Sequence, residues 1–347
     1  MPRRTKSSDK VRGKGSSDRS REGQDTTSSQ HVRLLTGATA EVNLSLSDFL
    51  IWCGDAEKLL DRLPNEPLFD LVVTSPPYNI GKVYETKTEL AKYIAWQTRI
   101  IEKIVPRVKS TGSICWQVGN FVDNGQIVPL DVEFDPIFRR QNLQLRNRII
   151  WHFGHGLHSQ RRFSGRYEVV LWYTKSENYV FNLDDVRVPA KYPGKKHFKG
   201  PKAGQLSGNP KGKNPEDVWE FTPGDLLGYP GSVWNIPNVK SNHVEKTTHP
   251  CQFPVGLVER LMKALSHDKA VVFDPFAGVA TVGVAAALFG RRFVGAELHK
   301  EFAEIGASRI RKALSGKISY RPADKPLYDH KQSKLSELPP EWKRTKK

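Results

Sequence analysis

Residues 268–297, DKAVVFDPFAGVATVGVAAALFGRRFVGAE, contain the pattern that decides the fold. An apolar run ends on Asp274, a turn of small residues and a helix-like segment follow, and a second apolar run ends on Glu297. This order predicts strand, loop, helix and a second strand parallel to the first, with Gly290 closing the helix. In an open α/β sheet, ligands bind beyond the carboxyl ends of such strands. The stretch therefore predicts a mostly parallel sheet with a ligand beside the two carboxylates.

The spacing within this stretch indicates a nucleotide-like ligand. Glu297 follows Gly278 by 19 positions, about where nucleotide-binding units place the acid that takes ribose hydroxyls. A membrane span is disfavoured, because the uncharged stretch 275–290 is short and rich in Gly and Ala. A purely structural strand–helix–strand unit would not explain why both strands end on carboxylates.

The composition favours a polyanionic partner. The chain has 347 residues, enough for one elaborated domain or two, and a net charge of +17. Cys53, Cys115 and Cys251 form no CxxC pair, which argues against a disulfide framework and a structural zinc site. No apolar segment follows the basic N-terminus, so we expect no signal peptide. These features predict a reduced protein of the cytoplasm, associated with the nucleoid and not with a membrane.

A second strand-like run, residues 69–73, leads into a rigid tetrapeptide, Ser75-Pro76-Pro77-Tyr78. Two prolines fix φ and remove two backbone donors, so the tetrapeptide cannot continue a sheet. It presents a hydroxyl, carbonyl oxygens and an aromatic ring. These groups suit a planar amine, whose hydrogens the oxygens accept while the ring stacks on its base. A tight turn with a surface tyrosine is the alternative.

The remaining periodic segments complete an alternating α/β pattern. A short strand at 51–55 ends on Asp55 and precedes a helix-like AEKLLDRL. Further strands are predicted at 113–118, 147–152 and 168–173, and helices at 88–108, 129–140, 254–265 and from 298 to about 313.

Two basic regions are predicted to contact nucleic acid. Between Arg139 and Tyr167 there are seven arginines and no acid, with aromatic residues interleaved. Between 185 and 215, eight Lys or Arg stand against Asp185 alone, a net of 8 − 1 = +7. The residues predicted to bind DNA are Arg161, Arg162, Lys195, Lys196 and Lys199.

A metal site is not expected. His152, His155 and His158 are spaced three apart, but Gly154 and Gly156 lie between them and no carboxylate is near.

Three motifs resemble those of the DNA amino-methyltransferases, which transfer methyl from S-adenosylmethionine to an exocyclic base nitrogen. They are Ser-Pro-Pro-Tyr at 75–78, His-Pro-x-x-x-Pro at 249–254 and Asp-Pro-Phe-x-Gly at 274–278. Their order is similar to the circularly permuted β-type arrangement, and the resemblance covers roughly 50–313. It implies a Rossmann-like, doubly wound α/β fold with an inserted DNA-recognition region.

The resemblance implies roles for single residues. The catalytic motif is matched by Ser75, Pro76, Pro77 and Tyr78. The S-adenosylmethionine site is matched by Asp55, His249, Pro250, Asp274, Pro275, Phe276, Gly278 and Glu297. Two departures stand out: Ala280 replaces a glycine of the usual loop, and Phe253 stands where many members carry Lys. The first is expected to tighten the approach of the methionine moiety, and the second to remove a charge contact to the cofactor carboxylate.

The same comparison divides the chain into five segments. We expect a disordered basic tail at 1–43, the catalytic half of the domain at 44–183, a target-recognition insertion at 184–248, the cofactor-binding half at 249–315 and a polar tail at 316–347.

The activity that the resemblance implies is site-specific methylation of cytosine N4 in double-stranded DNA, by base flipping and direct transfer. A motif that begins with Ser and the Phe at 253 are both typical of N4 members. The alternatives are an adenine-N6 enzyme of the same fold and a catalytically silent DNA-binding relative. A cytosine-C5 enzyme with Cys251 as nucleophile is disfavoured, because Cys251 starts an amphipathic helix instead of following a core strand. A cognate restriction endonuclease and the choice between monomer and homodimer stay open.

Overall fold

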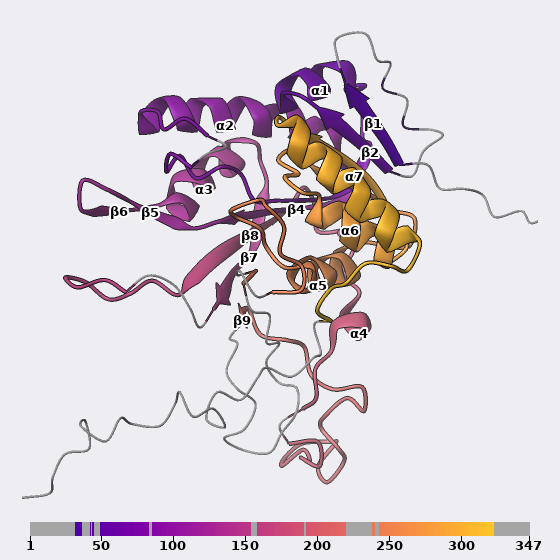
Figure 1. Cartoon of the computed structure of the whole chain (residues 1–347). Helices are drawn as coiled ribbons and strands as arrows, with labels where there is room; N and C mark the ends of the chain where they lie inside the picture. The colour runs from indigo at the N-terminus through magenta and orange to yellow at the C-terminus, as the bar shows by residue number, and fades with distance from the viewer. Residues whose placement is uncertain are drawn as a thin grey trace, which may run out of the picture.

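A nine-stranded, mostly parallel sheet runs through the described part of the chain (Figure 1). The computed structural model describes residues 32–36, 42, 44, 49–82, 85–153, 158–190, 192–219, 238–239 and 243–322. The strand order is β1-β2-β11-β10-β3-β4-β8-β7-β9. The strands are β1 (Val32–Thr36), β2 (Phe49–Cys53), β3 (Phe69–Thr74), β4 (Val108–Val118), β7 (Gln144–His152), β8 (Tyr167–Thr174), β9 (Val218–Trp219), β10 (Val271–Asp274) and β11 (Arg292–Glu297). A separate hairpin joins β5 (Asn120–Asp123) to β6 (Gln126–Pro129).

Helices cover both faces of the sheet, as Figure 1 shows. One face packs against α1 (Ala56–Arg62), α2 (Leu90–Ile104), a 3-10 turn (Val105–Arg107) and α3 (Leu130–Arg140). The other packs against α5 (Val255–Leu265), α6 (Thr281–Leu288) and α7 (Lys300–Leu314), with the short α4 (Leu183–Val186) beside α5. Alternate strand residues enter the two cores, as the period of two in a strand requires. None of these described helices is long and apolar enough to cross a bilayer.

The strand directions confirm the predicted α/β fold. β10 and β11 pair in parallel and are connected by α6. β3 pairs in parallel with both β10 and β4. β8, in contrast, is antiparallel to β4 and β7. The beginning of β8 therefore lies at the sheet edge where the parallel strands end.

The centre of the sheet is a topological switch point between β3 and β10. From β3 the chain passes through α2 to β4, whereas from β10 it passes through α6 to β11 on the other side. Thr74, at the end of β3, donates from Oγ1 to Asp274 Oδ1, at the end of β10, over 2.6 Å. The same carboxylate accepts from the Phe276 amide at 3.0 Å. This buried bond ties together the two loops that leave the switch point, where such sheets bind their ligands.

Residues assigned by sequence to the N-terminal tail extend the sheet. The prediction of a disordered tail to residue 43 is wrong for Val32–Thr36, which form β1 and pair in parallel with β2. Val32 and Leu34 pack against the core. Without β1, the edge of β2 would present unpaired backbone groups, which explains why this short run is recruited. Residues 1–31 lie outside the described residues.

The expected insertion at 184–248 is joined to the sheet at its edge. Two of its residues form β9, which pairs in parallel with β7. Before β9 in the chain, the buried Val188 exchanges two backbone hydrogen bonds with Lys213. The region is therefore a lobe, residues 187–213, held at its base by this bridge. Residues 220–237, with Trp234, and residues 323–347 lie outside the described residues.

We expect Asp274 to give part of the pH dependence of stability. Burial raises the pKa of Asp274 to about 7, so the folded protein holds a proton that the unfolded chain releases near pH 4. The wild-type free energy of unfolding should then fall as pH rises through this range. Asn at this position keeps an acceptor for Thr74 but does not titrate. Relative to wild type, Asp274→Asn should gain roughly 2 kcal/mol between about pH 5.5 and 8 in urea unfolding.

The exposed Asp185→Asn is the matched control and should show no such trend. A flat difference for Asp274→Asn would contradict the burial of a titrating carboxylate at the switch point.

Candidate active site

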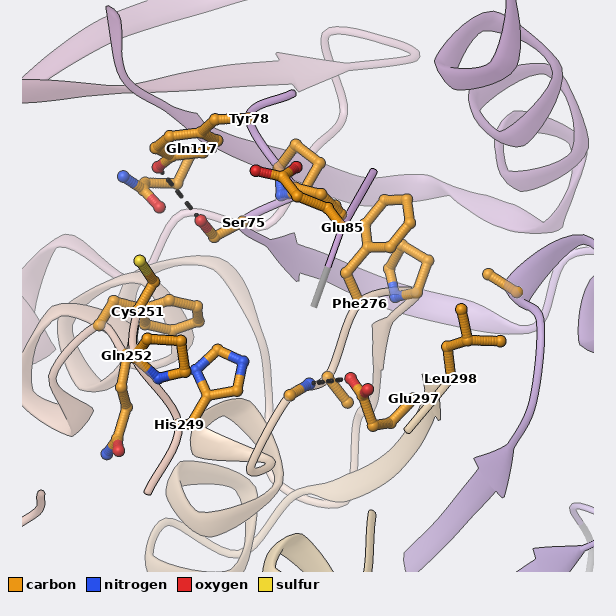
Figure 2. Close-up of a pocket in the computed structure, with 18 of the residues that line it drawn as sticks. Ser75, Tyr78, Glu85, Gln117, His249, Cys251, Gln252, Phe276, Glu297 and Leu298 are labelled. Carbon is orange, nitrogen blue, oxygen red and sulfur yellow. Dashed lines mark hydrogen bonds between the residues drawn. The ribbon is translucent and has the colours of Figure 1, made fainter. Parts of the chain in front are cut away.

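A cavity of about 720 Å³ opens at the carboxyl edge of the sheet, at the switch point. Its walls come from the loops after β2, β3, β10 and β11, the end of β4, the beginning of β8 and the segment before α5. Figure 2 shows Ser75, Tyr78 and Gln117 on one side, with Phe276 and Glu297 across the cavity. One cavity thus joins the rigid tetrapeptide to the loop that sequence alone assigns to a cofactor.

The structure brings most of the predicted site residues together. Those that line the cavity are Asp55, Ser75, Pro76, Pro77, Tyr78, His249, Pro250, Pro275, Phe276, Gly278 and Glu297. Asp274 does not line it, because its side chain is buried and bonded to Thr74 and the Phe276 amide. Its position indicates that Asp274 holds the loop in shape and leaves ligand contact to its neighbours.

Hydrogen bonds fix the Ser-Pro-Pro-Tyr tetrapeptide in one geometry. Ser75 Oγ and the Tyr78 hydroxyl lie 3.2 Å apart. Tyr93, on α2, donates its hydroxyl to the Pro77 carbonyl at 2.6 Å. This bond anchors the tetrapeptide to α2 through the Pro77 carbonyl.

The turn after the tetrapeptide is held from within its own loop. Asn79 has a φ of +59°, a region that Asn adopts more readily than most residues. Its side chain accepts from the Thr88 amide at 2.7 Å and donates to the Thr88 carbonyl at 2.8 Å. Glu85 accepts from the amides of Asn79 and Ile80. These bonds position the ring of Tyr78 at the cavity wall.

The cofactor-side loop is organised by Glu297. Its carboxylate accepts from the Gly278 amide at 2.9 Å and from the His299 amide at 2.8 Å. Gly278 has a φ of +53°, and a Cβ there would lie 3.3 Å from His249 Nε2, so the position favours glycine. A carboxylate offers about four acceptor sites, which leaves Glu297 able to accept from ligand hydroxyls. Burial lowers the pKa of His249 to about 4, so the imidazole is neutral at neutral pH.

Aromatic and acidic groups complete this end of the cavity. Phe276 packs edge-on against Trp96, with ring centroids 5.5 Å apart. Asp55 caps α1 by accepting from the Glu57 and Lys58 amides, and it also faces the cavity. An apolar wall with carboxylates at two strand ends fits a nucleoside whose hydroxyls and amine are donors.

Two further polar residues of the cavity wall were not predicted from sequence. Gln117 lies near the end of β4, and Glu168 near the beginning of β8. Glu168 accepts from Gln117 Nε2 and from the Tyr78 hydroxyl, the latter at 3.4 Å. Both lie within strands that the sequence predicts, but only the antiparallel direction of β8 brings Glu168 to this edge.

The predicted DNA-binding residues lie outside the cavity. Arg161 and Arg162 are exposed between β7 and β8, and Lys195, Lys196 and Lys199 are exposed on the lobe at 187–213. The arginine run that suggested this surface is, however, partly structural. Arg139, Arg146 and Arg148 form ion pairs with Asp135, Glu177 and Asp131 respectively. These acids neutralise them, so the basic surface between β7 and β8 is narrower than the run of charges indicates.

Two alternatives from the sequence concern metal and thiol chemistry. His155 lies outside the described residues, and within the described ranges no group of three potential ligands gathers around one point. Cys251 is exposed on the cavity wall four residues before α5, which begins at Val255. The prediction that Cys251 starts the helix is therefore wrong. Residues 252–254 separate it from the helix, and Pro254 is the N-cap.

Comparisons with known proteins place this site in a family. Residues 69–308, more than half of the chain, match the N6/N4 family of DNA methylases. The Type II methyltransferase M.BglII of Bacillus subtilis is 45% identical over 256 residues, covering 74% of this chain and 67% of the relative. M.ScaI of Streptomyces caespitosus is 36% identical over 297 residues, covering 82% and 91%. The DNA adenine methyltransferase YhdJ of Escherichia coli K12 is 30% identical over 262 residues, covering 74% and 81%.

Solved structures share the fold. The cytosine-N4-specific PvuII DNA methyltransferase superposes with a TM-score of 0.54 at 19% identity, covering 77% of this chain and 92% of that chain. A Thermus thermophilus protein, described as a putative DNA modification methylase and solved with S-adenosyl-L-methionine, gives 0.53 at 24% identity, covering 77% and 94%. With the family match over most of the cavity-forming region, the chain belongs to the N6/N4 amino-methyltransferase family of DNA methylases.

Proposed function

We propose that the protein transfers a methyl group from S-adenosylmethionine to the exocyclic N4 of cytosine in duplex DNA. The observation that carries this proposal is the shared cavity, in which Ser75 and Tyr78 lie across from Phe276 and from Glu297, the acid bonded to the Gly278 amide. Its volume, about 720 Å³, lies within the range of small-molecule and cofactor sites.

The tetrapeptide supplies the groups that a flipped base needs. Leaving the stack costs a few kcal/mol, which stacking on Tyr78 offsets in part. Ser75 Oγ and the Pro76 carbonyl then accept the two amine hydrogens. This orients the nitrogen lone pair toward the cofactor end of the cavity, and positioning of this kind is the main source of rate in a direct transfer.

S-adenosylmethionine is the cofactor that this cavity fits. When bound, it supplies an electrophilic methyl group on a positively charged sulfur. Glu297 and Asp55 are placed to accept from its ribose and adenine, and Phe276 offers the adenine an apolar contact. His249 and Pro250 also line the cavity, and His249 lies beside Gly278. Asp274 contributes indirectly, through the loop that it holds.

Cytosine N4 is proposed over adenine N6 because of two residues. The motif begins with Ser75, a neutral acceptor, and Phe253 stands on the cavity wall where a lysine is common in adenine members of the family. Adenine N6 is the second candidate, because YhdJ, an adenine methyltransferase by name, is 30% identical. Both bases present a planar amine, so the fold accommodates either.

The DNA partner is proposed to lie along the basic surface. Arg161 and Arg162 extend from the strand pair that carries Glu168, and the lysines of the lobe add charge that phosphates neutralise. The Type II relatives support a role in DNA modification, for which a restriction endonuclease would be the functional counterpart. We further propose that the protein acts at the nucleoid in the cytoplasm, as a monomer or a homodimer.

The product nucleoside tests the proposed activity. Incubated with S-adenosylmethionine and unmethylated duplex DNA, the protein should yield N4-methylcytosine, identified by mass spectrometry of the digested DNA. Cys251→Ala should give the same product at a comparable rate, because direct attack by an amine needs no thiolate. Ser75→Ala should lose most of the activity. Dominant N6-methyladenine would overturn the choice of base, and loss of turnover in folded Cys251→Ala would favour C5 chemistry.

Glu297 should set the affinity for S-adenosylmethionine. Removing its charge while keeping an oxygen acceptor, as in Glu297→Gln, should weaken binding roughly 10- to 100-fold in calorimetry, because hydrogen bonds to a charged group contribute about 1.5–3 kcal/mol. The exposed Glu304→Gln on α7 is the matched control and should bind like wild type. Wild-type affinity in Glu297→Gln would contradict the assigned cofactor contact.

The lobe should contribute to DNA affinity through charge alone. Replacing Lys195, Lys196 and Lys199 with Gln should weaken binding equally on all sequences. The slope of log affinity against log salt should fall by roughly 2 to 3 if all three meet phosphates. The control replaces Lys58, Lys312 and Lys317, which are exposed elsewhere, with the same change in net charge. Equal slopes for the two triple variants would remove the lobe from the DNA interface.

A further inference from the structure

The cavity contains a carboxylate bonded to the catalytic motif itself. Glu168 Oε2 accepts from the Tyr78 hydroxyl at 3.4 Å, and that hydroxyl lies 3.2 Å from Ser75 Oγ. Two hydroxyl groups, those of Ser75 and Tyr78, therefore form a chain of hydrogen bonds that ends at the Glu168 carboxylate. Gln117 donates to the same carboxylate oxygen and fixes its position.

The chemistry of the motif requires an acceptor of this kind. When the amine nitrogen bonds to the methyl carbon, the carbon–sulfur bond breaks and its electron pair stays on sulfur. The nitrogen then carries a positive charge until one of its protons leaves. Ser75 can accept a hydrogen bond from that proton, but a neutral hydroxyl cannot retain it.

The other carboxylates on the cavity wall are engaged differently. Within the described part of the chain these are Asp55, Glu85 and Glu297, and each accepts from two backbone amides. Such bonds occupy acceptor positions on each carboxylate and tie it to the loop that it shapes. The described hydrogen bonds to the Glu168 carboxylate come from two side chains, Tyr78 of the motif and Gln117 of β4.

Glu168 and the ring of Tyr78 both lie close to Gly119, the residue that follows β4. A Cβ at Gly119 would lie 3.3 Å from Glu168 Cγ and 3.1 Å from the ring of Tyr78. The glycine thus allows the carboxylate and the ring to approach the end of β4 together. The chain of hydroxyl groups is a consequence of this close approach.

We propose that Glu168 is the terminal acceptor of the proton that the exocyclic amine loses on methyl transfer. It acts through Ser75 and Tyr78, without touching the base. The amine gives its proton to Ser75, Ser75 gives its own to Tyr78, and Tyr78 gives its own to Glu168. The carboxylate becomes neutral as the cofactor loses its positive charge, so atoms and charges balance. The proposal rests on the proposed amine methylation.

The protonation behaviour of the group agrees with this role. Burial raises the pKa of Glu168 to about 7, although the bonds from Gln117 and Tyr78 act in the opposite direction. A base with a pKa near the working pH transfers protons most effectively. The titratable groups that face this chain are Tyr78 itself, whose pKa burial raises well above its usual value, and Cys251 from the segment before α5.

The test is the pH profile of single-turnover methyl transfer with saturating DNA and S-adenosylmethionine. Wild type should rise with pH and level off above about pH 7. Glu168→Gln should be slower by roughly 100-fold or more and should lose the rise. Glu168→Asp should recover part of the rate together with the pH-dependent rise. Affinity for S-adenosylmethionine should stay unchanged in both variants, and the exposed Glu177→Gln should match wild type throughout.

Tyr78→Phe removes the middle hydroxyl of the relay and keeps the aromatic ring, so this variant tests the proposal if Glu168→Gln does not fold. It should lose the same pH-dependent rise. A wild-type rate and pH profile in folded Glu168→Gln or in Tyr78→Phe would overturn the assignment of Glu168 while leaving methylation intact. Absence of any methylated base with wild-type protein would instead remove the proposed function, and this inference with it.

Discussion

The buried hydrogen bond between the Thr74 hydroxyl and the Asp274 carboxylate connects the ends of the two central strands. β3 leads into the Ser-Pro-Pro-Tyr tetrapeptide and β10 into the Asp-Pro-Phe-x-Gly loop, which lie near opposite ends of the sequence and line one cavity. Because the same carboxylate also accepts from the Phe276 amide, one buried acid fixes the distance between the two loops. Removing a carboxylate from water is unfavourable, and burial accordingly raises the pKa of Asp274.

The acids near the cavity differ in function because they differ in hydrogen-bond partners. Glu85 and Glu297 are bonded to backbone amides and give shape to the loops that surround the ligand. Glu168 is bonded instead to the side chains of Tyr78 and Gln117, and burial raises its pKa to about 7. The same side-chain chemistry thus serves as scaffold in one place and as proton acceptor in another, as the physics of local hydrogen bonding allows.

Basic residues show a similar division. Three arginines of the run are paired with acids on α3 and after β8. The pair of Arg139 lies within α3, whereas those of Arg146 and Arg148 connect β7 to the turn after β8 and to α3. Those between the strands and on the lobe remain exposed. Charge density along the sequence therefore overstates the surface that a polyanion meets, because ion pairing depends on neighbours in space.

The sequence by itself determined the fold class and both anchors of the site. Apolar runs that end on Asp274 and Glu297 indicate parallel strands, and two prolines after β3 require a rigid loop at its end. These signals are local, so they can be read without the fold. Only the tertiary structure decided what depends on pairing and direction. β1 was missed because five residues between polar flanks gain their stability from β2. The sequence could not show that Asp274 holds a loop, because its hydrogen-bond partner Thr74 lies 200 residues away in the chain. Glu168 reaches the cavity because β8 runs antiparallel to β4, and strand direction is set by the sheet as a whole.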